Sequence, residues 1–442
     1  MLKTIANIQN ANKIGVVIKA FSVSSTLNEQ YHSKVLVIGG GAGGCSVAAK
    51  FVNGLGKDNV TIIEPSDKHY YQPLFTLAGG GLKTVAQAEK NMGDVLPNGA
   101  KWIKDSVAEF DPKNNTVTTA RGDVVTYDIL LVAVGLETRY QDIPGLLQAL
   151  ENYDNVGSIY SPKYAEQAFR AIRKFDKGDV VYTYPNSPVK CPGAPQKICY
   201  IHEHFLQKNG KRSNAKVTYN TSLPVIFGVK QYADALWKVA KSRNINVNLR
   251  TCLVEVHPQK NEAIFQNLDK PDEKFAVKYS VLHAVPPMGT PNALKANKDI
   301  ANNMGFLTVD KLTLQHTKYP NIFGIGDCTD SPNSKTAAAV AAQCRIVYRH
   351  MRATLEGKPL TYAYDGYASC PLVTGAGKCI LAEFDYSLQP LETFPIRQDR
   401  EMYIMYLFKK ELMPFLYWNL MLKGYWNGPA IVRKMLHLGL SK

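Results

Sequence analysis

Short apolar runs separated by turns and helical stretches recur along this chain and predict its organisation. The first run occupies residues 34–38 and is followed by a glycine-rich turn and a helical stretch from Cys45 to Val52. A second run covers residues 60–63 and ends at Glu64. Apolar runs of this length, bounded by turns, are typical of strands buried in a parallel sheet. Strands that alternate with helices predict an α/β fold.

The same alternation returns in the middle of the chain. Strands are expected at residues 180–184, 216–220 and 245–249, and helices at about 195–207 and 231–242. This second set of strands and helices has the order of a nucleotide-binding unit. We therefore predict an α/β protein with two Rossmann-like domains, followed by a C-terminal region.

The first glycine-rich turn carries a candidate dinucleotide site. Its residues Gly39, Gly41 and Gly44 form a GxGxxG pattern between a strand and a helix, and Gly40 and Gly43 lie within it. The three glycines allow a tight turn, close approach of a pyrophosphate and close helix packing. The phosphates would lie at the positive end of the helix. Glu64, 20 residues after Gly44, is placed to accept hydrogen bonds from a ribose.

Two later segments resemble those of flavin disulfide reductases. They are the strand and turn at 127–135 and the strand at 321–327. The resemblance implies FAD rather than NAD, with Ala133 and Gly135 where the chain recrosses the dinucleotide and Asp327 at the ribityl chain. Gln72 and Val107 are also predicted to contact FAD.

An alanine-rich helix is expected at residues 334–343. The start of this helix and the Lys335 ammonium would stabilise the negative charge of the reduced flavin ring. A solvated lysine is the alternative for Lys335.

The phosphate loop of the second unit is degenerate. It reads TYPNSPVKCPGAP, with four prolines and one glycine. Proline has no amide proton to offer a phosphate, and its ring obstructs close approach, so nicotinamide binding is improbable. The loop contains Cys191 near the start of the next helix, a position that can favour a thiolate. A buried structural cysteine is an equally good interpretation from this region alone.

Composition and charge narrow the classes of function. The chain has 442 residues, 45% of them apolar, and a formal net charge of +15. It has no long basic block and no nucleic-acid motif, so a nucleic-acid partner is not expected.

Metal binding is not predicted either. The eight cysteines include no CxxC pair, and His202 and His204 point to different faces of a helix. Lys197 and Lys410 could steer anions, although solvated lysines are more common.

Residues 1–28 resemble a mitochondrial transit peptide. They contain lysines, apolar residues and a Ser/Thr cluster but no Asp or Glu; they also contain no arginine, which is atypical of transit peptides. A secretory signal is the competing interpretation, but Lys19 interrupts its apolar run.

The tail from Met402 to Lys442 combines aromatic and aliphatic residues with six basic residues and a single acid, Glu411. Its longest apolar run is far shorter than the roughly 20 residues needed to span a bilayer. The composition is typical of helices that lie in a membrane surface. Packing on the protein's own core or on a second subunit is the alternative.

Six segments resemble the sulfide:quinone oxidoreductase family, which belongs to the flavin disulfide reductases. They extend from Val37 to Trp426 and read VIGGGAGG, EPSDKHYYQPLFTLAGGG, VKCPGAPQK, IFGIGDCTDSPNSKTAAAVAAQ, SCPLVTG and LMPFLYWNLMLKGYW. The resemblance implies a redox pair of Cys191 and Cys370. Hydrosulfide would open a sulfur bridge between them at Cys370, and FAD would pass the electrons to ubiquinone. Cys379 is a second candidate partner, and the remaining cysteines are expected to be apolar fillers.

The resemblance also implies the partners and the location. Sulfite or glutathione would accept the sulfane sulfur. The protein would be peripheral or monotopic on the mitochondrial inner membrane, and it could form a homodimer.

The expected domains are a transit peptide at 1–28, an FAD domain at 33–145 and 291–360, a degenerate nucleotide domain at 146–290, and a redox-cysteine and membrane region at 361–442. A type II NADH:quinone oxidoreductase and a non-catalytic sulfur carrier are the alternatives.

Overall fold

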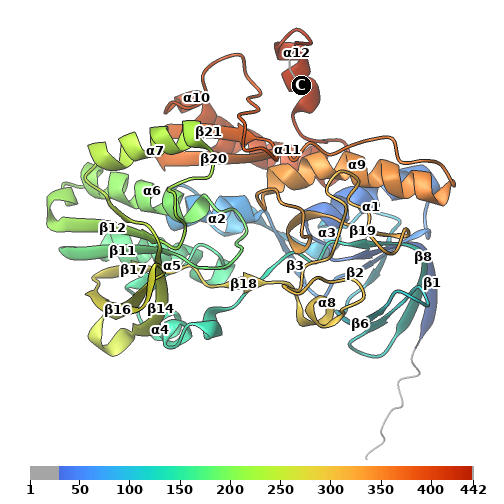
Figure 1. The fold of residues 1–442 in the computed structure, drawn as a ribbon, viewed down its shortest axis with the longest axis horizontal. Helices are drawn as coiled ribbons and strands as arrows, with labels where there is room; N and C mark the ends of the chain where they lie inside the picture. Colours follow the sequence, from blue (N-terminus) through green and yellow to red (C-terminus); the bar gives the residue numbers. More distant parts are fainter. Residues whose placement is uncertain (1–28, 441–442) are drawn as a thin grey trace, which may run out of the picture.

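The computed structural model describes residues 29–440 (Figure 1). The predicted transit peptide at 1–28 therefore lies outside the described residues. Within them, the first sheet has the strand order β5-β2-β1-β8-β7-β6, and β19 pairs with β8. Its strands are β1 (Gln30–Ile38), β2 (Val60–Ile63), β5 (Lys101–Ile103), β6 (Val107–Asp111), β7 (Thr116–Thr119), β8 (Val124–Val132) and β19 (Ile322–Gly324).

Three parallel strands of this sheet, β1, β8 and β19, end at the same edge. Ile38 pairs with Val132, and Gly324 also pairs with Val132. The loops that follow these strands therefore begin side by side, at the edge where α/β sheets bind ligands. They carry Gly39, Gly135 and Asp327.

Two long helices, α1 (Ala42–Leu55) and α9 (Ala337–Leu355), pack against each other next to this sheet (Figure 1). The sequence pattern placed the start of α9 too early, at residue 334. The helix begins at Ala337 because the Thr336 hydroxyl accepts a hydrogen bond from the Ala339 amide and caps it. Lys335 thus precedes the helix.

The second sheet is parallel and has the order β10-β17-β11-β12-β13. Its strands are β10 (Val156–Gly157), β11 (Gly178–Tyr184), β12 (Ala215–Thr221), β13 (Asn246–Asn248) and β17 (Val281–His283), and helices α5 (Pro162–Lys174), α6 (Ala194–Lys208) and α7 (Lys230–Ser242) accompany it. The predicted α/β class with two Rossmann-like sheets is confirmed. An antiparallel sheet of β14 (Thr251–His257), β15 (Glu262–Asn267) and β16 (Lys270–Lys278) was not predicted.

The C-terminal region starts with a hairpin of β20 (Ala368–Gly375) and β21 (Lys378–Phe384). A helical segment follows from Tyr403 to Met421, in which α10 (Tyr403–Leu407) and α11 (Met413–Leu416) alternate with π-helical turns at 408–412 and 417–421. The last helix is α12 (Ala430–Leu436). Figure 1 shows this region lying across both sheet-containing halves. Among residues 29–440, no helix is both long and apolar enough to cross a membrane.

Shorter elements complete the described chain. They are β3 (Lys68–Tyr70), α2 (Phe75–Gly79), β4 (Glu89–Asn91), α3 (Met92–Val95), β9 (Glu137–Thr138), α4 (Leu146–Asn152), β18 (Met288–Gly289) and α8 (Asn292–Ala296).

Candidate functional site

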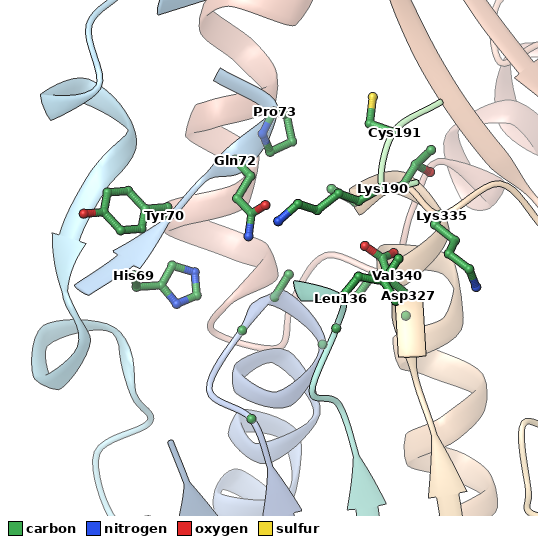
Figure 2. Close-up of a pocket in the computed structure, with 18 of the residues that line it drawn as sticks. His69, Tyr70, Gln72, Pro73, Leu136, Lys190, Cys191, Asp327, Lys335 and Val340 are labelled. Atoms are coloured by element: carbon green, nitrogen blue, oxygen red, sulfur yellow. The ribbon is translucent and has the colours of Figure 1, made fainter. Parts of the chain in front are cut away.

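A cavity opens at the edge where β1, β8 and β19 end (Figure 2). Most of the predicted cofactor-binding residues line it, namely Gly39, Gly41, Gly43, Glu64, Gln72, Ala133, Gly135, Asp327 and Lys335. Gly40 and Gly44 lie in the same turn without lining the cavity. Val107 begins β6 and is not among the lining residues, so its predicted contact with the cofactor stays a prediction.

The glycine turn has the geometry that a dinucleotide needs. Gly39 has a φ of +101°, and a Cβ atom there would lie 2.6 Å from the Ala133 carbonyl oxygen. A Cβ atom at Gly44 would overlap the Gly39 carbonyl oxygen. Both positions therefore require glycine. The turn opens onto the start of α1, where unpaired backbone amides attract phosphate.

Glu64 is held at the end of β2 by backbone amides. Its two carboxylate oxygens accept hydrogen bonds from the Gly40 and Ser66 amides, both at 2.7 Å. A carboxylate has about four acceptor positions, so capacity remains for the hydroxyls of a ribose. The residues of this part of the cavity fit the sugar of a dinucleotide.

Two lysines lie near Asp327 at the other part of the cavity. Burial raises the pKa of Asp327, and Lys335 and Lys190 oppose this shift. The Lys335 ammonium donates to the Thr329 carbonyl oxygen at 2.8 Å and lies 4.9 Å from the Phe306 ring centre. Burial lowers the pKa of Lys335, which is therefore not a solvated lysine. In Figure 2 Lys190 extends into the cavity toward Gln72, a placement that the sequence did not suggest.

The C-terminal region also contributes to this cavity, through Tyr417. His69 donates from Nδ1 to the Gly40 carbonyl oxygen at 3.0 Å, and Nε2 accepts from the Tyr417 hydroxyl at 2.6 Å. Burial lowers the pKa of His69 to about 4, so the ring is neutral and can make both contacts. His69 thus links the glycine turn to Tyr417, which lies 348 positions after His69, and nothing in the sequence indicates this link.

The structure brings Cys191 and Cys370 together. Cys191 precedes α6 and lines the cavity, whereas Cys370 lies on β20. The buried Lys197 ammonium contacts both sulfurs, at 3.4 Å from Cys191 and 3.7 Å from Cys370. A Cβ atom at Gly193 would lie 2.5 Å from the Cys370 sulfur, so glycine is needed for β20 to approach this closely.

The two thiols have different acidities. The Cys370 thiol donates a hydrogen bond to the Cys191 sulfur, and this bond together with Lys197 lowers the pKa of Cys191 well below its usual range. The same hydrogen bond, together with burial, raises the pKa of Cys370. The directions of the two shifts favour ionisation of Cys191 before Cys370.

Lys197 was expected from the sequence to be solvated, and that expectation is wrong. Its side chain is only 2% exposed because it lies on the face of α6 that packs against β20. Burial lowers the pKa of Lys197, but the Cys191 and Cys370 sulfurs more than offset this, so the pKa lies above its ordinary value. Its position six residues after Cys191, nearly two helical turns further, is the one signal the sequence contained.

A second buried lysine reaches the same place from the C-terminal region. Lys409 lies in the first π-helical turn and donates to the Pro73 carbonyl oxygen at 2.9 Å. Burial, with a contribution from Lys197, lowers the pKa of Lys409 to about 8. The neighbouring Lys410, which we considered from the sequence, instead pairs with Glu411 at 3.7 Å.

Cys379 does not contact the pair. It packs with the core of the first sheet, whereas Cys370 faces the core of the second. The Cys379 thiol donates to the Ile380 carbonyl oxygen at 3.6 Å, and burial raises its pKa to about 12. The opposite faces of the hairpin separate these two cysteines.

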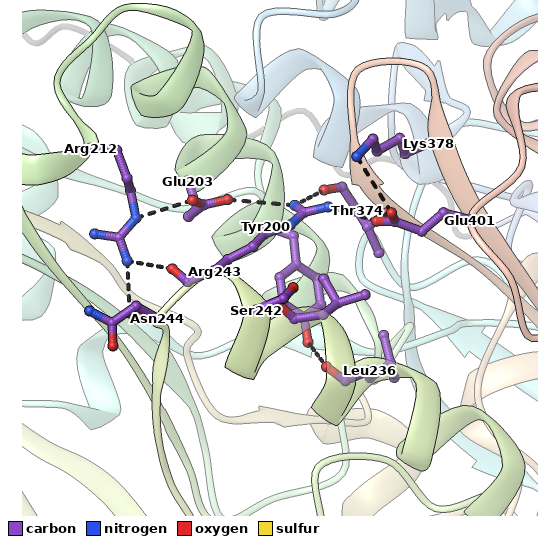
Figure 3. A network of polar contacts seen from close by, with 11 residues as sticks. Tyr200, Glu203, Arg212, Leu236, Ser242, Arg243, Asn244, Thr374, Lys378 and Glu401 are labelled. Atoms are coloured by element: carbon purple, nitrogen blue, oxygen red, sulfur yellow. Dashed lines mark hydrogen bonds and ion pairs between the residues drawn. The ribbon is translucent and has the colours of Figure 1, made fainter.

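A buried charge network ties α6 to the hairpin that carries Cys370 (Figure 3). Arg243, just after α7, lies 3.5 Å from Glu203 on α6 and 2.6 Å from Glu401. Its guanidinium also donates to the Thr374 carbonyl oxygen on β20. Arg212 pairs with Glu203 from the other side at 3.1 Å. The network thereby holds the helix after Cys191 against the strand of Cys370.

Two residues of the segment His202-Glu203-His204 help to fix α6 in place. His202 donates from Nε2 to the Gly79 carbonyl oxygen at 2.7 Å and accepts from the Tyr182 hydroxyl at 2.9 Å. Its neighbour Glu203 faces the arginines. In the part of the chain that the structure describes, no three His, Cys, Asp or Glu side chains are grouped as metal ligands would be.

Comparisons with known proteins agree with a flavin disulfide-reductase type of fold. Residues 33–177 match the family described as pyridine nucleotide-disulphide oxidoreductase. The chain is 49% identical to mitochondrial sulfide:quinone oxidoreductase of Mus musculus, over 93% of this chain and 91% of the relative. It is 42% identical to the protein of that name from Dictyostelium discoideum, over 90% and 87%. The X-ray structure of sulfide:quinone oxidoreductase from Aquifex aeolicus has the same fold, with a TM-score of 0.76, 21% identity, and coverage of 93% of this chain and 95% of that one.

Proposed function

This chain belongs to the family of mitochondrial sulfide:quinone oxidoreductases, and on that premise we propose that Cys191 and Cys370 are its redox pair. The enzyme oxidises hydrogen sulfide and reduces a quinone. Its cofactor is FAD. One observation carries the proposal for the pair: two thiols, 179 positions apart in the chain, contact one buried lysine beside the dinucleotide cavity.

The cavity offers the residues that would hold FAD. These are Gly39, Gly41, Gly43, Glu64, Gln72, Ala133, Gly135 and Asp327, supported by Gly40 and Gly44 in the turn. FAD, when bound, supplies a two-electron acceptor that passes electrons from sulfur to the quinone.

The surroundings of the two sulfurs favour attack of hydrosulfide at Cys370 of a Cys191–Cys370 disulfide. The hydrosulfide sulfur forms a bond to Cys370, the bond between the two cysteine sulfurs breaks, and its electron pair stays on Cys191 as a thiolate. Cys191 is the better leaving group because its sulfur lies closer to the Lys197 ammonium, at 3.4 Å compared with 3.7 Å for Cys370. The Lys197 ammonium stabilises the charge that develops there.

The outer sulfur of the Cys370 persulfide then passes to a nucleophile. The nucleophile forms the new bond to this sulfur, and Cys370 keeps the electron pair of the bond that breaks. When their disulfide forms again, the Cys191 thiolate and the Cys370 thiol together give up two electrons and one proton, and bound FAD would accept the electrons. We propose sulfite or glutathione as the acceptor, because both are anions and the site holds two buried ammonium groups, Lys197 and Lys409.

The loop that carries Cys191 disfavours the rival NADH chemistry. Pro185, Pro188 and Pro192 stand between β11 and α6, where a nicotinamide dinucleotide would need backbone amides. We therefore expect NADH not to reduce this enzyme.

Anaerobic spectroscopy of the purified holoenzyme tests the function. Sulfide is expected to bleach the oxidised flavin absorbance within the mixing time of a manual assay, and decylubiquinone to restore it. With sulfite the product is thiosulfate, and with glutathione it is glutathione persulfide. Bleaching by NADH but not by sulfide would favour a type II NADH:quinone oxidoreductase. A flavin that neither donor reduces would favour a sulfur carrier.

The exposed side of the C-terminal region fits a lipid surface. Its exposed apolar residues include Tyr403, Ile404, Phe415, Tyr425, Ile431 and Met435, and Lys423 and Lys434 lie among them. Apolar side chains flanked by lysines suit the boundary of an anionic membrane. We propose that this surface binds the mitochondrial inner membrane, from which a quinone would reach the site.

Flotation with vesicles of phosphatidylcholine and cardiolipin tests this surface. The wild-type protein is expected to float, and the double variant Phe415→Asp, Ile431→Asp to stay in the soluble fraction. Phe275→Asp is the matched control, because Phe275 is an exposed residue of β16, away from the C-terminal region (Figure 1). A wild-type protein that stays soluble and forms dimers in light scattering would show that the surface binds a second copy instead.

A further inference from the structure

The backbone of Cys191 adopts a conformation that is rare for any residue except glycine. Its φ is +52°, in the left-handed region. Such conformations persist when the surrounding structure holds them in place, and they occur at functional sites. The Cys191 carbonyl oxygen accepts a hydrogen bond from the Ala194 amide at 2.9 Å, which closes the turn at the start of α6.

Two further hydrogen bonds hold this peptide from outside the turn. The Cys191 amide donates to the Lys335 carbonyl oxygen at 2.7 Å. The Tyr160 hydroxyl donates to the Cys191 carbonyl oxygen at 3.2 Å. Lys335 and Tyr160 come from segments before α9 and after β10, so three distant parts of the chain meet at one peptide unit.

The Tyr160 hydroxyl is suited to constant donation. Its side chain is buried, lines the cavity, and packs in the same cluster as Ala194 and Cys370. Burial, with smaller contributions from Cys191 and other neighbours, raises the pKa of Tyr160 well above its ordinary value. The phenol therefore keeps its proton across the working range of pH, which suits a residue that holds a geometry rather than one that exchanges protons.

We propose that Tyr160 is a positioning residue for the sulfide reaction, holding Cys191 in its left-handed turn and so keeping the Cys191 sulfur against Lys197 and Cys370. The inference rests on the proposed function of the pair and extends it to a residue that touches neither sulfur through a hydrogen bond. Without the hydroxyl, the Cys191 peptide keeps its bonds to Lys335 and Ala194 but loses the contact that fixes its carbonyl group from the Tyr160 side, and it can shift toward a commoner conformation. The sulfur then moves away from Lys197, and the thiolate is less stable.

The pKa of Cys191 depends on how close its sulfur lies to Lys197 and Cys370. A change in this pKa therefore reports a movement of the sulfur, as long as the other groups near it stay in place. Lys197 on α6, Cys370 on β20 and Lys409 in the C-terminal region act most strongly on the Cys191 thiol. The titratable groups that its charge influences include Tyr71, Tyr160, Tyr184 and Asp327. Of these, only the Tyr160 hydroxyl bonds to the Cys191 backbone.

The test compares Tyr160→Phe with Tyr184→Phe in the holoenzyme. Tyr184 is a buried tyrosine on β11 in the same cluster, and it does not bond to the Cys191 backbone. Alkylation of reduced Cys191 by iodoacetamide is followed against pH, and flavin bleaching by sulfide is followed at neutral pH. Tyr160→Phe is expected to raise the alkylation midpoint by about one pH unit and so to slow alkylation about tenfold at any pH below both midpoints. Bleaching by sulfide is expected to slow as well, because a less stable Cys191 thiolate is a poorer leaving group. Tyr184→Phe is expected to match the wild type in both measurements.

An unchanged alkylation midpoint in Tyr160→Phe would overturn the proposal, whatever happens to its melting temperature or FAD content. A lower melting temperature alone would indicate a merely structural role. The alkylation profile does not require sulfide oxidation, so it remains informative if sulfide fails to bleach the wild-type flavin. That failure would overturn the proposed function without deciding the role of Tyr160.

Discussion

Cys191→Ser and Cys370→Ser are each expected to lower sulfide-dependent quinone reduction by about four orders of magnitude or more, the usual effect of removing a catalytic nucleophile. Cys370 must receive the sulfur and Cys191 must leave as a thiolate, so neither step survives loss of one sulfur. A serine hydroxyl is too weakly acidic to replace either group. Stopped-flow bleaching of the flavin by sulfide measures the loss.

Cys379→Ser is the matched control for these variants. Cys379 lies on the same hairpin, but it faces the other core, and a serine hydroxyl could still donate to the Ile380 carbonyl oxygen. Its turnover is expected to stay close to that of the wild type. Turnover within tenfold of the wild type in both Cys191→Ser and Cys370→Ser would rule out the proposed redox pair.

Lys197→Met is expected to slow sulfide-dependent bleaching at neutral pH, by at most about two to three orders of magnitude. Two unit charges about 4 Å apart attract by about 4 kcal/mol at an effective dielectric constant of about 20, which corresponds to at most about three pH units. Lys197 lies 3.4 Å from the Cys191 sulfur and helps to lower the pKa of that thiol. Its removal therefore raises the pKa of Cys191, and the loss of rate should shrink as the pH rises.

The pH dependence of bleaching separates this effect from a general loss of structure. In Lys197→Met the profile should move to higher pH, with the rate recovering toward the wild-type value in alkaline buffer. Lys208→Met is the control, because Lys208 is an exposed lysine at the end of the same helix. A Lys197→Met profile that is lower but unshifted would mean that the ammonium does not act through the cysteine thiolate.

Local features of the sequence predicted most of the architecture. The apolar runs at 34–38 and 180–184 became central strands of two sheets, and the glycine turn after the first run became the wall of the cavity. The start of α9 was missed by three residues because the Thr336 cap was not recognised. The antiparallel sheet of β14, β15 and β16 was missed because its mixed polar and apolar residues do not form one buried run.

The charged and hydroxyl groups around the pair could not be predicted in the same way. From the sequence Lys197 is one polar residue on a helix, and nothing local indicates that β20 covers it. Lys409 and Tyr417 reach the site from two π-helical turns of the C-terminal region, and the sequence pattern did not predict these turns. Tyr160 acquires its partner only when the loop after β10 and the turn before α6 come together.

The amino-acid sequence by itself determined the alternation of strands and helices, the dinucleotide turn, the proline-rich loop that lacks phosphate-binding amides, and the presence of two cysteines in characteristic surroundings. These depend on neighbouring residues, whose backbone preferences and hydrophobic period are local properties. Only the tertiary structure decided that Cys191 and Cys370 share the Lys197 ammonium, and that Lys409 and Tyr160 lie close to this pair. Acidity and burial depend on which distant groups are packed within a few ångströms, and that is a property of the folded chain.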